Sequence, residues 1–161
     1  ILKNIFNSIN DPTSNSRKLT AIAAHYSGKA INLTKTTAPH ALSYKISERS
    51  NIAHGHAVAL TLGKFFELNE RVSQKNNQSH NDTMLLRQKE IYQMMDVHNS
   101  KEAEILWYKM MSSCKLTNNL SELLLDNNAS IKEVIDNINI ERLSNHPVKL
   151  RRDDLISIFN A

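Results

Sequence analysis

The scarcity of glycine limits what this chain can form. Only three of its 161 residues are glycine, and only three are proline. Tight β-hairpin turns and phosphate-cradling loops depend on glycine, which alone adopts positive φ at no steric cost. Neither a G-x-G-x-x-G motif nor a P-loop occurs, and strand patterns are weak throughout. The sequence therefore predicts an all-α protein.

Helical periodicity supports this prediction from the first third of the chain onward. Asp11-Pro12 is typical of a helix cap followed by proline at the first helical position. Four apolar residues then recur at helical spacing: Leu19, Ile22, Tyr26 and Ile31. Small residues line an adjacent face: Ala21, Ala24 and Gly28. Such a stripe would let another helix approach closely.

Further helix signals continue to the end of the chain. The apolar run over 55–68 predicts a buried helix, and the polar segment 73–82 predicts a loop. Asn99 or Ser100 can cap the helix that carries Trp107, and Ser130 with Glu133 forms a capping-box pattern. Pro147 precedes a last amphipathic segment. The prediction is one all-helical domain over 1–161, a bundle of about seven or eight helices.

Composition excludes several classes of function. The longest apolar runs are short, so no segment is expected to span a membrane. The net charge of +4 is scattered among acidic residues, unlike the one-sided charge of nucleic-acid binders. The single Cys114 excludes an intramolecular disulfide and indicates the reducing cytoplasm. Because it stands in a helical run beside two methionines, Cys114 is interpreted as an inert thiol.

Two histidines stand beside marked backbone features. His40 follows Pro39, and His54 precedes Gly55, fourteen residues later. One continuous helix would separate them by about 21 Å. The segment 47–51, however, reads as a helix end and turn, and the residues after it can bring His54 back alongside His40. Imidazole is a common ligand of transition metals, so the spacing permits a shared metal ion without requiring one.

The residues alone leave a metal centre incomplete. A catalytic site needs about three protein ligands and an open position, and no Asp-x-x-x-His or His-x-x-x-His motif lies near the pair. Four other histidines are interpreted as surface, packing or turn residues: His25, His80, His98 and His146. The last of these, in a loop before Pro147, could also line a cleft.

These residues resemble the iron-dependent alcohol dehydrogenases of the dehydroquinate-synthase-like group. The similar pattern is His40 in a small-residue context, followed by Ala53-His54-Gly55 opening an apolar helix. The resemblance is specific over about 16–62, loose over 67–140, and returns in the ending 142–148. It implies a two-domain enzyme, in which an N-terminal α/β domain binds NAD(P) and a helical C-terminal domain carries the metal.

The resemblance also implies four metal ligands, namely an aspartate and a histidine four residues apart and then the histidine pair. Only the pair, His40 and His54, matches positions in this chain. The expected metal is Fe²⁺, with Zn²⁺ as the alternative. Because the sequence begins at Ile1 without an initiator methionine, we expect a C-terminal piece of such a dehydrogenase, inactive by itself.

Two positions near the pair depart from the family pattern. Tyr44 stands where many members carry a histidine on the proton path, and a phenol is a poor proton relay near neutral pH. His56 stands where many alcohol dehydrogenases have a small or apolar residue. Both are predicted to line the substrate side. The amino-acid sequence around the pair is most similar to that of the branch acting on small aldehydes such as phosphonoacetaldehyde.

The expected reaction is reduction of a small aldehyde, or oxidation of the alcohol, with a metal polarising the carbonyl for hydride transfer from NAD(P)H. No nucleic-acid or membrane partner is expected, and a homo-oligomer stays open. Two alternatives remain. One is a non-catalytic helical interaction domain with structural histidines, and the other is a dehydroquinate-synthase-like lyase, whose histidine pair is usually more widely spaced.

Overall fold

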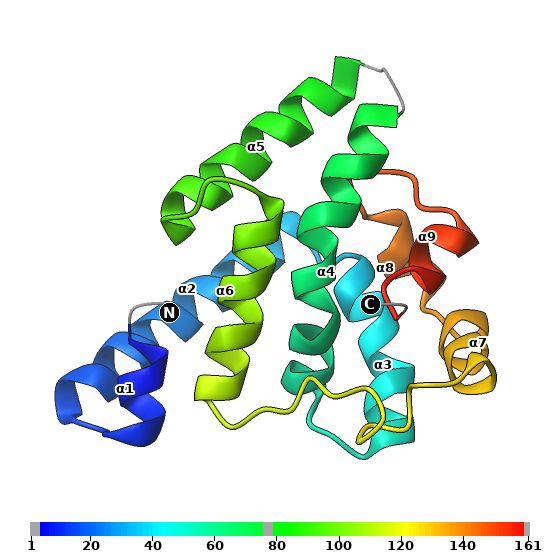
Figure 1. The fold of residues 1–161 in the computed structure, drawn as a ribbon. Helices are drawn as coiled ribbons and strands as arrows, with labels where there is room; N and C mark the ends of the chain where they lie inside the picture. Colours follow the sequence, from blue (N-terminus) through cyan, green and yellow to red (C-terminus); the bar gives the residue numbers. More distant parts are fainter. Residues whose placement is uncertain (1–3, 76–78, 160–161) are drawn as a thin grey trace.

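Helices account for all the regular secondary structure in the part of the chain that the computed structural model describes, residues 4–75 and 79–159. These residues form nine α-helices and no strand (Figure 1). In chain order they are α1 (Ile5–Asn10), α2 (Ser14–Thr34), α3 (Ala38–Ser50), α4 (His54–Lys75), α5 (Ser79–Met95), α6 (Ser100–Ser113), α7 (Asn128–Asp136), α8 (Ile140–Ser144) and α9 (Arg152–Ile156). The predicted all-α class is confirmed, with slightly more helices than the seven or eight expected.

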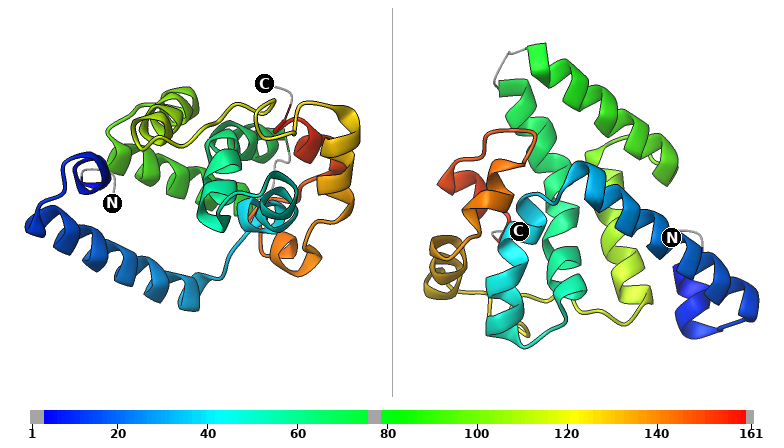
Figure 2. Two further views of the ribbon diagram at one scale, coloured as in Figure 1. Left: turned by 90° about the horizontal axis from the view of Figure 1, so that it is seen from below. Right: turned by 180° about the vertical axis from the view of Figure 1, so that it is seen from behind.

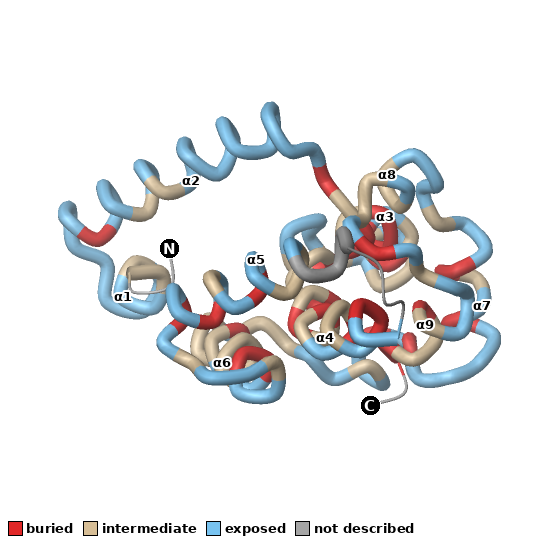
Figure 3. The backbone as a smooth tube through the Cα atoms, turned by 90° about the horizontal axis from the view of Figure 1, so that it is seen from above, coloured by how far each residue is buried: buried red, intermediate tan, exposed pale blue. Residues whose placement is uncertain are grey.

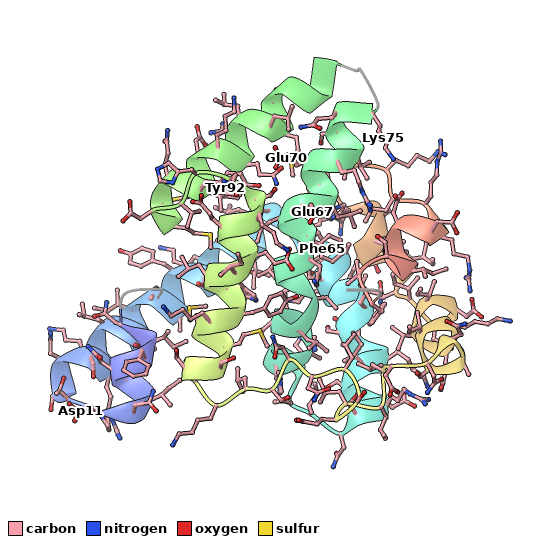
Figure 4. All side chains as sticks on the ribbon, viewed as in Figure 1. Asp11, Phe65, Glu67, Glu70, Lys75 and Tyr92 are labelled. Carbon is pink, nitrogen blue, oxygen red and sulfur yellow. The ribbon has the colours of Figure 1, made fainter. Side chains whose placement is uncertain are left out.

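The antiparallel helices α3 and α4 form the centre of the molecule. α6 packs on one side of α4, and the short helices α7, α8 and α9 gather on the other side of the pair (Figures 1 and 2). Phe65 of α4 points into this core, where it is 2 % exposed (Figure 4). Leu42 and Ile46 of α3 and Val134 of α7 are fully buried around it. Burial of such side chains supplies the main stabilisation of the fold.

A close approach fixes how α6 lies on α4. A Cβ atom on Gly63 would come within 2.8 Å of the Tyr108 ring, so only glycine fits without a shift. The Tyr108 hydroxyl donates to the carbonyl of Leu60, and the Trp107 indole donates to the carbonyl of Ala59. These hydrogen bonds satisfy the polar ends of two half-buried aromatic rings. Gly63 is therefore used for helix packing rather than for a turn.

A smaller apolar cluster joins α5 to the rest of the molecule. Tyr92 of α5 (labelled in Figure 4) packs against Phe66 of α4, with Met95 and Ala103 nearby. Burial raises the pKa of Tyr92 to about 12, and the charge of Glu70 acts in the same direction. The Gln88 amide donates to the Tyr92 hydroxyl. This cluster therefore holds α5 against α4 and α6.

Helix α2 extends along one edge of the molecule and is mostly exposed (Figure 3). Of its residues only Ser16 is buried, and the apolar positions that predicted the helix, such as Tyr26 and Ile31, face solvent. The stripe of small residues is exposed too, and nothing described lies within 4 Å of a Cβ built on Gly28. The predicted helix is confirmed, whereas the predicted close partner is absent among the described residues.

Two predicted caps are wrong by two or three residues. Asp11 ends α1, and Thr13 caps α2 by accepting a hydrogen bond from the backbone of Ser16. Asn127, not Ser130, caps α7 in the same way. In both cases the side chain that caps is the one on extended backbone just before the helix. Of the two candidates for α6, Asn99 is the cap.

The predicted polar loop over 73–82 is shorter than expected. α4 runs on to Lys75 and α5 starts at Ser79, so only 76–78 separate the helices, and these three lie outside the described residues. Polar helix formers such as lysine and glutamine continue a helix readily on an exposed face. Within the described residues, no helix is both long enough and apolar enough to cross a membrane.

Candidate metal centre

His40 and His54 lie side by side. His40 is in the first turn of α3, just after a proline that fits the start of a helix, and His54 opens α4. Their ring centroids are 5.5 Å apart with the planes inclined by 59°. The ring of Tyr44, one turn after His40, lies 5.3 Å from that of His54. Three of the four residues singled out from the sequence therefore meet in one place.

The fold-back expected from the sequence produces this meeting. α3 continues to Ser50 and ends at Asn51, which adopts the left-handed conformation with φ of 50°. The Ser47 hydroxyl donates to the carbonyl of Ile52 and closes the turn. Asparagine tolerates this backbone region better than most residues. The three residues 51–53 then turn the chain back, and α4 begins at His54, whose ring meets that of Tyr44.

Ser43 orients the ring of His54. Its side chain is fully buried, and its hydroxyl donates to the carbonyl of His40 at 2.8 Å. The same oxygen lies 3.3 Å from Nδ1 of His54. Because the single hydroxyl proton is already donated, the oxygen accepts from Nδ1–H. His54 is therefore held as the tautomer with Nε2 unprotonated and free to bind a metal.

The pair fits two ligands of one ion. Imidazoles that bind a metal at about 2.0–2.1 Å in tetrahedral geometry have ring centroids roughly 5 Å apart, close to the observed separation. Ligation requires the neutral ring, and the pKa of His40 is lowered, first by burial and then by the charges of His54 and Arg142. Within the described ranges, no group of three His, Cys, Asp or Glu side chains is placed to hold an ion. The two imidazoles form half of a site.

Arg142 approaches the pair from α8, at the far end of the sequence. Its guanidinium lies over the Tyr44 ring, 5.4 Å from the centroid, and donates to the hydroxyl of Thr36, a buried residue before α3. The sequence reasoning named neither Ser43 nor Arg142 as a site residue. Arg142 and Thr36 stand 106 positions apart, and no local pattern links them.

His56 is not brought to the pair. Residues two apart in a helix are rotated by about 200° around its axis, so their side chains point to nearly opposite sides. Accordingly, His56 donates through Nε2 to the carbonyl of Thr117 at 2.7 Å, and its ring contacts neither His40 nor His54. This bond ties α4 to the segment after α6. The geometry gives no support to a place for His56 on the substrate side.

The remaining histidines lie elsewhere in the described chain. His25 is exposed beside Tyr26, and His98 bonds Glu102 at the start of α6. His146 packs against Phe65 and bonds Asn69 of α4. Burial raises the pKa of the Cys114 thiol, which agrees with its interpretation as an inert thiol. The side chain of His80 lies outside the described residues.

The whole chain matches the model of one protein family. The model described as "Fe-containing alcohol dehydrogenase family, C-terminal" matches residues 1–161, the whole chain. The chain belongs to this family. It corresponds to the C-terminal domain, as the resemblance of the histidine pair and its flanks predicted.

One relative of known name matches a shorter stretch of this chain. The chain is 48% identical over 50 residues to the phosphonoacetaldehyde reductase of Streptomyces viridochromogenes. The matched stretch covers 31% of this chain and 13% of the relative, so most of the relative's length lies outside the match. No solved structure matches the chain. Membership in the alcohol dehydrogenase family supports the assignment of this chain to an oxidoreductase.

Proposed function

We propose that this chain is the metal-binding domain of an NAD(P)-linked alcohol dehydrogenase that reduces a small aldehyde. The observation that carries the proposal is the adjacent pair His40 and His54, with Ser43 leaving Nε2 of His54 free. Family membership supports the reaction class. Phosphonoacetaldehyde is our proposed substrate, on the basis of the similarity to the Streptomyces reductase.

Each residue of the pair's surroundings has a proposed task. His40 and His54 hold a divalent metal, Fe²⁺ first and Zn²⁺ as the alternative. When bound, such an ion stabilises the negative charge that develops on a carbonyl oxygen during hydride transfer from NAD(P)H. Ser43 keeps the proton on Nδ1 of His54. Tyr44 is 41% exposed beside the pair and can donate a hydrogen bond to a substrate oxygen.

The two ligands that the resemblance adds, and the nucleotide-binding domain, are proposed to belong to the parent enzyme, in the cytoplasm. The 161-residue chain by itself is therefore expected to bind a metal weakly and to reduce no aldehyde. The non-catalytic alternative makes a different prediction, because structural histidines need no ion. The family match over the whole chain favours a dehydrogenase over the lyase alternative.

Metal binding by the chain tests this proposal. Co²⁺, a spectroscopic substitute for Fe²⁺ and Zn²⁺, is titrated into the metal-free chain and followed by visible absorption. One equivalent should bind, and His40→Ala and His54→Ala should each abolish the absorption bands. His98→Ala is the matched control, because the His98 side chain is exposed and bonds Glu102. Circular dichroism checks the folding of each variant. If the two alanine variants bind Co²⁺ like the wild type, the pair is structural and the proposal fails.

A further inference from the structure

Arg142 carries a charge that no described carboxylate neutralises. Three of the six other arginines pair with acidic groups: Arg49 with Glu133, Arg87 with Glu90 and Arg152 with Asp136. No carboxylate of the described residues lies within 4.0 Å of Arg142, although Glu141 is its neighbour in sequence. Among the described residues, the guanidinium donates one hydrogen bond, to the neutral hydroxyl of Thr36. A guanidinium has five N–H donors in a planar fork, so most of them are left over.

The position of Arg142 directs this charge toward the candidate metal centre. The guanidinium lies over the face of Tyr44, and the Tyr44 ring in turn lies against His54. Thr36 and the Tyr44 ring together restrict the side chain of Arg142, so little conformational entropy is lost when the remaining donors bind a ligand.

The surroundings are open enough for a ligand. His54 is exposed, Tyr44 is 41% exposed, and His40 and Arg142 are partly exposed. A molecule that contacts the histidine pair at one end would therefore meet a positive, donor-rich group a short way along the Tyr44 ring. Phosphonate and carboxylate groups match the planar fork of arginine through paired hydrogen bonds.

We propose that Arg142 is the residue that recognises an anionic group on the substrate, so that this site selects aldehydes carrying a phosphonate or carboxylate close to the carbonyl. The inference rests on the proposed function, since it assumes that the aldehyde end faces His40 and His54. Arg142 supplies charge and paired donors to the substrate's anionic end, while Thr36 and Tyr44 hold the guanidinium in place. A nucleotide phosphate offers the same oxygen chemistry, and the test separates the two sources.

The test is a titration of the metal-free 161-residue chain with methylphosphonate, acetate, ADP and the neutral analogue acetamide. Binding is followed by the ¹⁵N-coupled signals of the arginine Nε–H groups. The signal of Arg142, assigned by its loss in Arg142→Lys, should shift saturably with methylphosphonate and with acetate. It should not shift with acetamide. A response to ADP alone would assign Arg142 to the nucleotide and overturn the proposal.

Variants complete the test. Arg142→Met should weaken methylphosphonate binding by at least about tenfold, because charge and paired donors are both lost. Arg142→Lys keeps the charge without the planar fork and should fall between the two. Arg87→Met, which removes an exposed arginine on α5, should bind like the wild type. Wild-type affinity in Arg142→Met, or no saturable shift in the wild type, would overturn the proposal.

Two outcomes separate this inference from the proposed function. His40→Ala should lose Co²⁺ binding and keep methylphosphonate binding, since Arg142 is retained. A chain that binds Co²⁺ through the pair yet shows no methylphosphonate response at Arg142 would remove only the anion inference. If Arg142→Met loses its helical circular dichroism, the shift of the Arg142 signal in the wild type still decides the question.

Discussion

The hydroxyl of Ser43 lies 3.3 Å from Nδ1 of His54 and fixes which nitrogen of that ring can bind a metal. The arrangement works because the hydroxyl proton is committed to the carbonyl of His40. Ser43 thus connects the two proposed ligands, one through its backbone and the other through its ring. Hydrogen-bond partners behind metal ligands commonly fix the tautomer and orientation of the ring.

Replacement of Ser43 by alanine should therefore weaken metal binding while leaving both imidazoles in place. The affinity of the chain for Co²⁺ or Zn²⁺ is expected to fall by about 10–100-fold. A competition titration with a chelating dye measures this loss. Ser27→Ala is the matched control, because the Ser27 hydroxyl makes the same kind of backbone bond on an exposed face of α2. Equal affinities in the two variants would show that Ser43 does not orient the ring.

Gly63→Ala should destabilise the protein, because the added methyl group meets the Tyr108 ring at 2.8 Å. The expected loss in the free energy of unfolding is about 1–3 kcal/mol, the usual cost of overpacking. Urea unfolding followed by circular dichroism measures it.

Gly28→Ala provides the control for this prediction. Gly28 is also inside a helix, but nothing described lies within 4 Å of the new methyl group. Alanine there should stabilise α2 by about 0.5–1 kcal/mol, because glycine loses more backbone entropy on folding. Stabilisation in both variants would mean that helix propensity, not packing against α6, decides the effect at Gly63.

Sequence reasoning predicted the parts of this structure that depend on local properties. Few glycines and a helical period give an all-α chain, and a helix end near Ser50 brings His54 back to His40. The caps at Thr13 and Asn127 were missed because neighbouring polar residues could also cap. Which one does so depends on which residue has extended backbone.

The rest of the site depends on tertiary contacts that leave no local signal. Arg142 reaches Thr36 across 106 positions, and only the packing of α8 beside α3 brings them together. Similarly, the family pattern that singles out His56 does not contain its contact with Thr117, because that contact depends on where the segment after α6 lies. Spacing within one hairpin is predictable, and contacts between distant helices are not.

His146 should make the protein less stable in acid. Burial lowers its pKa from the usual 6.5 to about 4; Nδ1 is enclosed with no partner among the described residues, while Nε2 bonds Asn69. Below pH 6.5 the unfolded chain takes up a proton that the folded chain refuses. Stability therefore falls as the pH drops from 6.5 to about 4, by up to ~1.4 kcal/mol per pH unit.

Urea unfolding at several pH values measures this contribution. His146→Gln, which cannot titrate, should show a shallower loss of stability over the same pH range. His25→Gln, on the exposed face of α2, should keep the wild-type slope. Identical slopes for the wild type and His146→Gln would show that the ring is protonated in the folded protein.

The carboxylate of Glu104 in α6 has two lysine partners, one partly buried and one exposed. Its side chain is 6% exposed and contacts Lys64 of α4 at 2.7 Å and the exposed Lys101 at 3.8 Å. Removing a partner from a buried ion pair leaves an uncompensated charge, which costs about 3–5 kcal/mol, whereas an exposed partner contributes about 0–1 kcal/mol. Lys64→Met should thus destabilise the protein far more than Lys101→Met in urea unfolding. Adding Glu104→Gln to Lys64→Met should recover part of the loss, since the buried charge is then gone. Equal losses in the two lysine variants, or no recovery in the double variant, would show that this ion pair does not hold α6 on α4.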